Sequence, residues 1–487
     1  MARTPWPIGA QRPLDGAGAL TSFALRPEDL RTHGVVLGMT GSGKTGLLMV
    51  LMEEAVRAGV PLLVLDVKGD MANLGLACDR PGPQGFVPWL DPTDLESPDN
   101  TVTPTVDSVA QALDSQRTRG LIPWSLSPAD CAALNDSLAL RVLTPGARHG
   151  SPLHLLSGLE RPSTRWSTDP DAAQSALASA LSMVLRRLRL DSDPTSSRAH
   201  VLLSAFATRR HQAGEPCRLE DLVQDLEAPP IEELGALSVD EFVSKPQRAE
   251  LAASLNTLLA SPSFAVWREG CALDVGQWLA KRSDGRTPVT LVSVAHLDDD
   301  DRAAVLGLVL DDTLSWVRTL SGTTALRALV VFDEVYGYLP PHPANPPTRK
   351  PLVSLMKQGR AFGVGVLLAT QNPMDLDYRA LSNAGLWFVG RLQTDADRER
   401  VVEAIAPSTP RRARPKARGG GRDPSPEASV APTLADRVKS LASRWFVLHT
   451  AREGEGRGLG LLRPREALSW LKGPLTLREL ARRNGAG

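Results

Sequence analysis

The sequence predicts an α/β protein in which a mainly parallel sheet carries a large, mostly helical insertion. An apolar run at 34–40, a helical stretch at 44–58 and a second apolar run at 61–66 form a strand–helix–strand unit. Such a unit joins parallel strands, because its helix crosses over one face of the sheet. This pattern stops near residue 80 and resumes near residue 289, so the residues between them form the insertion.

The patterns along the chain divide it into six segments. Helix-like stretches broken by Pro and Gly fill the insertion, whereas the strand-like runs VTLVSVAH, ALRALVVFDE, VGVLLATQ and LWFVGRL follow it at strand–helix spacing. The expected segments are an irregular N-terminal segment (1–33), the first part of the core (34–80), the insertion (81–286), the second part of the core (287–405), a low-complexity basic linker or loop (406–433) and a C-terminal segment packing on the core (434–487).

The composition excludes several classes of protein. With 487 residues, 42% hydrophobic and 23% charged, the chain can bury a large core. Its 55 Lys and Arg balance 55 Asp and Glu, which excludes polyanion binding by bulk charge but leaves a local basic patch open. No apolar run approaches the roughly 18 residues of a membrane span, and the N-terminus lacks the apolar core of a signal peptide. The four cysteines are too widely spaced for a zinc knuckle or a disulfide framework, so we expect a cytoplasmic protein without membrane contact.

The strongest motif is GMTGSGKT, which matches GxxxxGK[ST] and lies between a predicted strand and a predicted helix. Closely spaced backbone amides and the helix N-terminus attract phosphate groups, and glycines leave room for them. Lys44 is expected to reach the β- and γ-phosphates, and the Thr45 hydroxyl to bind Mg²⁺. The expected nucleotide-binding residues of the motif are Gly38, Met39, Thr40, Gly41, Ser42, Gly43, Lys44 and Thr45.

A second motif, VVFDE, ends an apolar strand with two acidic residues. Ligands of α/β proteins bind at the carboxyl ends of strands, so both carboxylates are placed at the expected site. Asp333 is expected to hold Mg²⁺ through water, and Glu334 to polarise the attacking water. The pair predicts nucleotide hydrolysis rather than binding alone.

Two further residues are less specific on their own. Gln371 ends the strand that follows the one carrying Asp333, where its amide can face the γ-phosphate or simply cap a loop. Arg360, in KQGRAFG, lies between these two strands. Its planar, permanently charged guanidinium suits phosphate, but a solvated arginine at a helix end remains the alternative.

Together the motifs GMTGSGKT, DVKGD (66–70), VVFDE, KQGRAFGVGVLLATQNP and LSNAG resemble the HerA/FtsK superfamily of P-loop ATPases. They are most similar to HerA-like bacterial ATP-binding proteins with a DUF87-type core. The resemblance covers 25–79 and 289–403 well, and the tail pattern RWFVLHT…LSWLKGPLT also resembles that group. It implies a RecA-like (ASCE) core, ATP and Mg²⁺ as cofactors, and a homo-oligomeric, hexameric ring that moves double-stranded DNA.

The resemblance also assigns roles by position. It matches Lys44 and Thr45 to the Walker A pair, Asp333 and Glu334 to the Walker B pair, Gln371 to the polar sensor, Arg360 to the arginine finger of a neighbouring subunit and Asp66 to the acid of the second strand. Two departures concern the partner. About 33 residues before the core are too few for the usual β-barrel, and the insertion is larger than in the archaeal relatives. Docking of a nuclease or another effector protein therefore stays open.

Three functions remain in competition on the sequence. The first is a DNA-translocating ATPase, the second an ATPase that remodels or assembles protein without DNA, and the third a nucleotide switch with negligible turnover. Glu334 argues against the switch, because a protein that only binds nucleotide needs no base. The basic residues between 411 and 422 can contact DNA or form a solvated linker.

Overall fold

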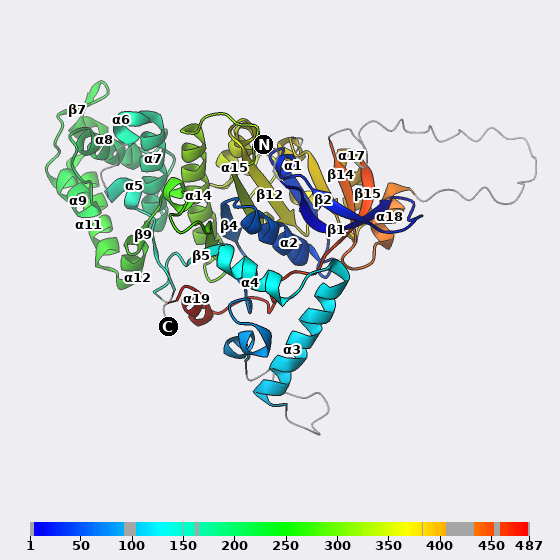
Figure 1. The fold of residues 1–487 in the computed structure, drawn as a ribbon. Coiled ribbons are helices and arrows are strands. Elements are labelled where there is room, and N and C mark those ends of the chain that lie inside the picture. The colour runs from blue at the N-terminus through cyan, green and yellow to red at the C-terminus, as the bar shows by residue number, and fades with distance from the viewer. Residues whose placement is uncertain are drawn as a thin grey trace, which may run out of the picture.

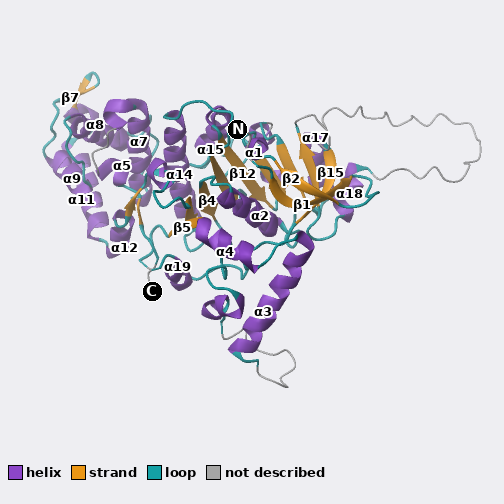
Figure 2. Cartoon of the chain, in the orientation of Figure 1, coloured by secondary structure: helices purple, strands orange, loops and turns teal. Residues whose placement is uncertain are grey.

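The computed structural model describes residues 4–91, 104–148, 150–160, 165–381, 383–405, 433–451 and 458–485. An eleven-stranded sheet runs through the molecule in the order β2-β1-β15-β14-β13-β3-β12-β11-β4-β10-β5 (Figures 1 and 2). Its strands are β1 (Trp6–Pro13), β2 (Thr21–Leu25), β3 (Gly34–Leu37), β4 (Leu62–Asp66), β5 (Leu138–Leu143), β10 (Thr287–Ser293), β11 (Ala328–Asp333), β12 (Val364–Thr370), β13 (Leu386–Val389), β14 (Phe446–Thr450) and β15 (Leu459–Pro464).

The helices of the core and of the C-terminal segment surround this sheet. They are α1 (Pro27–Leu30), α2 (Lys44–Arg57), α14 (Asp299–Arg318), α15 (Arg349–Gln358), α16 (Tyr378–Leu381), α17 (Asp395–Ile405), α18 (Leu434–Ser440) and α19 (Leu477–Arg483). Short 3₁₀ helices are η1 (Met71–Asn73), η2 (Gly82–Gly85), η3 (Val87–Trp89), η5 (Ile122–Trp124), η6 (Val266–Arg268), η7 (Gly359–Phe362) and η8 (Pro373–Asp375).

The strands from β13 to β5 are all parallel. In this part of the sheet β12 lies between β3, which leads into GMTGSGKT, and β11, which carries VVFDE. An extra strand between these two motif-bearing strands is the arrangement of a RecA-like P-loop core. The predicted fold class, an α/β protein with a mainly parallel sheet, is therefore confirmed.

The sheet separates two hydrophobic cores. Alternate residues of its strands face opposite sides, so Val35 and Leu63 enter the core beneath α14 and α15, whereas Val36 and Leu62 enter the core beneath α2. Burial on both faces explains why these strands are continuous apolar runs in the sequence.

The N-terminal segment corrects an expectation. Residues 1–33 were expected to be irregular, but they form β1, β2 and α1. Trp6 and Ile8 of β1 are buried, and β1 pairs antiparallel with β15, more than 400 residues later in the chain. Because its partner is so distant, the local Pro and Gly content concealed the strand. The C-terminal segment likewise supplies β14 and β15 to the sheet.

The interval 81–286 is mainly helical, but one strand within it belongs to the main sheet. β5 pairs in parallel with β10 and forms the sheet's edge. Leu138 and Val142 of β5 are buried and Arg141 is exposed, and this half-buried edge pattern lacks the long apolar run of a central strand. The parallel sheet therefore continues beyond residue 80.

The remaining helices of this interval gather at one end of the molecule, opposite the antiparallel strands β1, β2 and β15 (Figure 1). They are preceded by α3 (Val106–Leu121) and α4 (Pro128–Ser137) and comprise α5 (Ser157–Glu160), α6 (Arg165–Thr168), α7 (Pro170–Arg187), α8 (Arg198–Gln212), α9 (Leu219–Glu227), α10 (Val239–Phe242), α11 (Lys245–Ala260), α12 (Pro262–Ala265) and α13 (Val275–Trp278). The short strands β6 (Leu153–His154), β7 (Glu233–Leu234), β8 (Leu237–Ser238) and β9 (Cys271–Ala272) connect them. The predicted basic linker lies almost wholly outside the described residues, since 406–432 are not described.

Candidate nucleotide-binding site

The loop from Gly38 to Gly43 joins the end of β3 to the first turn of α2. Gly41 (φ 77°) and Gly43 (φ 97°) adopt left-handed conformations that favour glycine. A Cβ atom on Gly43 would also lie 2.9 Å from Cγ of Arg444, so both the backbone conformation and the lack of space favour glycine at this position. The loop ends at the N-terminus of the 14-residue α2, where unpaired backbone amides can bind an anion.

Lys44 is buried at the start of α2, and its Nζ donates hydrogen bonds to the carbonyl oxygens of Gly38 and Met39. Burial, and then the nearby charge of Lys68, lower the pKa of Lys44 to about 8, although Glu334 and Asp333 act in the opposite direction. A phosphate group placed here would compensate a cation that burial now disfavours. The site therefore fits the phosphates of a nucleotide.

Asp333 and Asp66 end neighbouring strands, and the register of β11 and β4 places them side by side. Burial and the proximity of Asp333 raise the pKa of Asp66 to about 7. Burial also raises the pKa of Asp333 to about 6, with Lys68 opposing and Glu334 reinforcing the shift. Oδ2 of Asp333 is buried and has no hydrogen-bond partner within the described part of the chain. It is therefore free to accept a hydrogen bond from a water molecule that is bound to Mg²⁺.

Asp66 has a structural role that the sequence did not reveal. Its Oδ1 accepts a hydrogen bond from the Gly69 amide (2.7 Å), and its Oδ2 accepts one from the Met71 amide (3.1 Å). Both carboxylate oxygens thus fix the turn that follows β4. This turn positions Lys68 over the site.

Glu334 is held in place by three neighbouring groups. Its Oε2 lies 2.7 Å from Nζ of Lys68, and its Oε1 accepts hydrogen bonds from the Thr370 hydroxyl (2.7 Å) and the Gln371 amide (3.3 Å). Its backbone φ of 62° is unusual for a residue other than glycine, and such strain clusters at functional sites. Burial would lower the pKa of Lys68, but the ion pair with Glu334 raises it overall.

Lys68 and Thr370 were missed by the sequence analysis. Thr370 is the last residue of β12, and Lys68 follows the end of β4 inside the quoted DVKGD motif, so their positions were available as a signal. Nothing in the sequence, however, shows that these side chains converge on Glu334. That convergence follows from the adjacency of β4, β11 and β12.

Gln371 and the C-terminal segment both contact the phosphate-binding loop. Thr40 donates a hydrogen bond from Oγ1 to Oε1 of Gln371 (2.9 Å), so the predicted polar sensor lies beside the loop. From the C-terminal segment, Ser443 donates to the carbonyl oxygen of Gly41 (2.8 Å), and the Arg444 amide donates to that of Ser42 (2.9 Å). These two residues, more than 400 positions from the motif, support the loop from outside.

Arg360 lies at the opposite edge of the sheet from these residues. It belongs to η7, just before β12, whereas the loop lies beyond the far end of β12. Seven residues of strand separate the two edges by about 20 Å. The Arg360 side chain is exposed and makes no hydrogen bond or ion pair to any other residue that the structure describes.

His33 connects α15, the helix that precedes Arg360, to strand β12. Its Nδ1 accepts a hydrogen bond from the Val366 amide of β12 (3.1 Å), so its proton is on Nε2, which donates to the Met356 carbonyl oxygen of α15 (2.8 Å). Burial lowers the pKa of His33 to about 4; the bond to Met356 opposes this shift and Arg360 adds to it.

We expect acid to destabilise the fold through His33. A histidine whose folded pKa lies below its unfolded value contributes stability above pH 6.5 that is lost as the pH falls toward 4. The loss should reach about 2 kcal/mol at pH 5 relative to pH 7. Urea unfolding of wild type and His33→Gln at both pH values measures it, because the variant lacks the titrating ring. Equal pH dependence in the two proteins would contradict the assignment.

We also expect Lys68→Met to lower ATP turnover roughly tenfold, a part of the 10²–10⁴-fold that a general base contributes. The reason is that Glu334 loses the cation that positions it. ATP affinity should change less than turnover. The matched control is Lys439→Met, at an exposed lysine of α18. Unchanged turnover in the Lys68 variant would show that Lys68 does not position Glu334 for catalysis.

Residues 14–142 match the family model described as the central domain of helicase HerA. The DNA double-strand break repair helicase HerA of Saccharolobus solfataricus is 26% identical over 123 residues, which is 24% of this chain and 24% of the relative. The match thus spans about a quarter of the curated relative's length.

Solved structures with a similar chain course include VirB4 of Thermoanaerobacter pseudethanolicus, with a TM-score of 0.48 and 11% identity, covering 95% of this chain and 96% of that one. The plasmid coupling protein TrwB in complex with ADP and Mg²⁺ gives a TM-score of 0.43 and 13% identity, covering 93% and 89%. The HerA match of 14–142 contains the whole phosphate-binding loop and the turn that carries Lys68. These matches therefore support the similarity of this chain to P-loop ATPases of the HerA/FtsK type.

Proposed function

We propose that this protein hydrolyses ATP with Mg²⁺ as a hexameric ring and moves along double-stranded DNA. The observation that supports hydrolysis is the buried Glu334. Lys68 and Thr370 hold it at the same edge of the sheet as Lys44, the first residue of α2. A protein that only binds nucleotide has no need of a fixed carboxylate there.

Each residue of the site has a distinct role in this proposal. Lys44 and the amides from Gly41 to Thr45 bind the β- and γ-phosphates, and Gln371 orients the terminal phosphate or the attacking water. Glu334 accepts the proton of that water at its carboxylate. Asp66 shapes the turn that holds Lys68, and Lys68 keeps Glu334 in place.

Thr45 and Asp333 would hold the Mg²⁺ ion. The unpaired, buried Oδ2 of Asp333 supports this assignment. When bound, Mg²⁺ neutralises charge on the β- and γ-phosphates as the terminal bond breaks.

The ring is supported by the position of Arg360. An exposed, unpaired arginine about 20 Å from its own phosphate-binding loop cannot serve that loop, but it can serve the loop of a neighbouring copy. DNA as the substrate is supported by two similarities. Residues 14–142 match the central domain of helicase HerA, and the curated relative of this chain is a DNA double-strand break repair helicase.

We expect duplex DNA to stimulate ATP hydrolysis several-fold at low salt, and the stimulation to fall steeply as salt is raised from about 50 to 200 mM. The steep fall follows from counterion release at phosphate contacts. ATPase rates of the full chain with and without duplex DNA measure it, with Lys44→Ala as the inactive control. No DNA binding at low salt for several duplex lengths would favour the alternative, an ATPase that remodels or assembles protein.

A further inference from the structure

An arginine-lined pocket lies at the edge of the sheet, away from the nucleotide-binding loop. Its volume is about 310 Å³, and it opens where β5 and β10 begin, between the ends of α4, α13 and α19. The arginines that line it are Arg141 on β5, Arg282 and Arg286 in the loop before β10, and Arg483 at the end of α19. We call this set the arginine pocket.

The charges of the arginine pocket are poorly balanced. The described residues that line it include no Asp or Glu. Two carboxylates act on these arginines: Asp284, which lies 2.8 Å from Arg282 and 2.9 Å from Arg286, and Asp79, whose charge acts on Arg483. Four arginines against two aspartates leave two positive charges (4 − 2 = 2).

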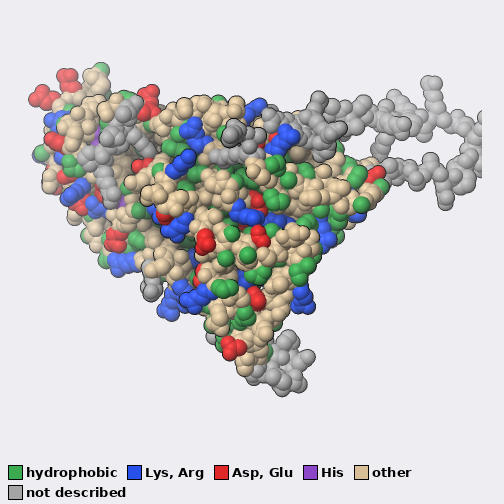
Figure 3. Space-filling model, viewed as in Figure 1, with side chains coloured by type: hydrophobic (Ala, Val, Ile, Leu, Met, Phe, Trp, Pro, Cys, Tyr) green, Lys and Arg blue, Asp and Glu red, His purple; other side chains and the backbone are tan. Residues whose placement is uncertain are grey.

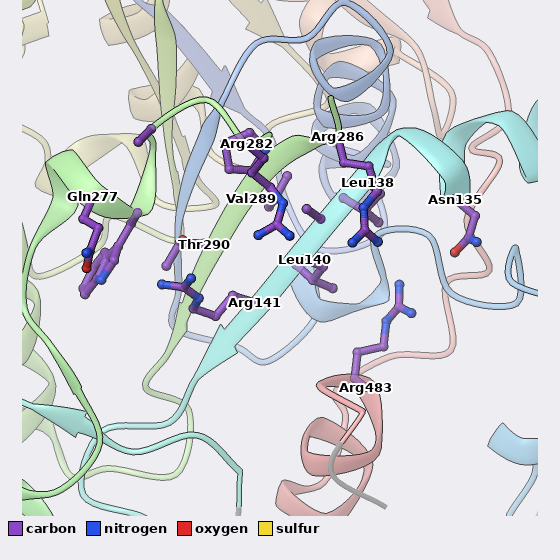
Figure 4. A pocket seen from close by; sticks show the side chains of 14 residues that line it. Asn135, Leu138, Leu140, Arg141, Gln277, Arg282, Arg286, Val289, Thr290 and Arg483 are labelled. Carbon is purple, nitrogen blue, oxygen red and sulfur yellow. The ribbon is translucent and has the colours of Figure 1, made fainter. Parts of the chain in front are cut away.

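The side chains of Arg286 and Arg483 point at each other, whereas Arg141 extends away from them toward Thr290 (Figure 4). Arg483 extends from α19 toward Arg286, and Arg282 lies beside Arg286 in the same view. Lys and Arg side chains also gather on the surface near α19 in Figure 3. Asp284 offsets the repulsion between Arg282 and Arg286, but the approach of Arg483 to Arg286 stays unfavourable unless a further anion lies between them.

Arg483 gives a second, independent indication of a ligand. Its Nη2 donates a hydrogen bond to the Leu74 carbonyl oxygen, but its Nε is buried and has no hydrogen-bond partner among the residues described. Burial lowers the pKa of Arg483, with Asp79 and Cys78 opposing the shift. An unpaired donor on a poorly solvated cation is stabilised by a bound anion.

The pocket is held in shape by the chain itself. Asn484, next to Arg483, bonds both backbone groups of Val142 on the free edge of β5, accepting from its amide (2.8 Å) and donating to its carbonyl (2.7 Å). This contact fixes the end of α19 against the edge strand. Arg483 therefore faces Arg286 from a constrained position (Figure 4).

We propose that the arginine pocket is a second anion site, which binds the phosphate groups of a polynucleotide backbone. Guanidinium groups bind phosphate through paired hydrogen bonds and remain charged at every physiological pH. The pocket is distinct from the nucleotide site, because it lies toward the amino ends of β5 and β10, whereas Asp66 and Asp333 lie at the carboxyl ends of the parallel strands β4 and β11. Seven residues of β10 place these edges about 20 Å apart.

A polynucleotide and a small free phosphate share this recognition chemistry. The polynucleotide source rests on the proposed function, whereas the anion site itself does not. The test therefore uses two probes on the full chain: inorganic pyrophosphate, measured by titration calorimetry, and a short fluorescent DNA duplex, measured by anisotropy. Pyrophosphate is titrated in the Lys44→Ala background so that the phosphate-binding loop does not contribute.

The test variant is Arg141→Gln/Arg282→Gln/Arg286→Gln, three exposed positions at which substitution spares the core. The matched control is Arg26→Gln/Arg198→Gln/Arg209→Gln, also exposed and outside the pocket. We expect the test variant to bind pyrophosphate at least tenfold more weakly than the control. Its slope of log affinity for duplex against log salt should fall by up to about 2.7, at about 0.9 for each lost charge.

Each outcome decides the proposal. Loss of both pyrophosphate and duplex binding in the test variant supports it as stated. Loss of pyrophosphate binding with unchanged duplex binding overturns the polynucleotide as ligand and assigns the pocket to small phosphates. Equal pyrophosphate affinity in test and control variants overturns the anion site. Duplex binding that is absent from wild type as well, while pyrophosphate still distinguishes the variants, contradicts the proposed DNA function and leaves the site as one for small phosphates.

Discussion

Glu334→Gln is expected to bind ATP and scarcely hydrolyse it. The amide keeps the size of the carboxylate and can still accept from Thr370, but it cannot take a proton from water. Turnover should fall by about 10²–10⁴-fold, the contribution of a general base. ATP affinity and single-turnover hydrolysis, measured on the same preparation, separate binding from chemistry.

Lys44→Ala provides the contrasting result. Loss of a charged hydrogen-bond donor to phosphate should weaken ATP binding by roughly 10- to 100-fold and abolish hydrolysis with it. Glu399→Gln, an exposed glutamate of α17, is the matched control for Glu334 and should behave as wild type. Wild-type turnover in Glu334→Gln would show that another group activates the water.

The sequence was sufficient for those parts of the site that lie on one strand and its following loop. GMTGSGKT specifies a strand, a tight turn and a helix within a dozen residues, and VVFDE places two carboxylates where a buried strand ends. Both are local patterns, in which the residue types themselves require the backbone that they adopt. The alternation of strands and helices likewise predicted the parallel sheet.

The sequence was not sufficient for contacts that depend on which strands become neighbours. Lys68 reaches Glu334 because β4 pairs with β11, and Thr370 reaches it because β12 pairs on the other side. Trp6 is buried because β1 pairs with β15 at the other end of the chain. Such long-range pairing leaves no periodic signal in the local sequence.

Arg360→Ala is expected to retain ATP binding and lose about 10³-fold or more in turnover, because an arginine finger stabilises the charge of the transition state. Within a single chain, Arg360 lies too far from the phosphate-binding loop to contact a nucleotide there. Arg360 lies at the amino end of β12 and the phosphate-binding loop lies beyond its carboxyl end, about 20 Å away. No rotation of one side chain covers that distance, so any contribution of Arg360 to catalysis must come from a second copy.

Mixing two inactive variants, Arg360→Ala and Lys44→Ala, shows whether this happens. A mixed ring contains interfaces at which an intact Lys44 of one copy meets an intact Arg360 of the next, so activity should return as the two are combined. Arg209→Ala, at an exposed arginine of α8, replaces Arg360→Ala in the control and should be active alone. If labelled subunits exchange and no ratio restores hydrolysis, the trans role is wrong. Near-normal turnover of Arg360→Ala alone would instead identify a solvated arginine at a helix end. Restored activity would couple assembly to catalysis, since a lone copy would then hold ATP without the residue needed to hydrolyse it.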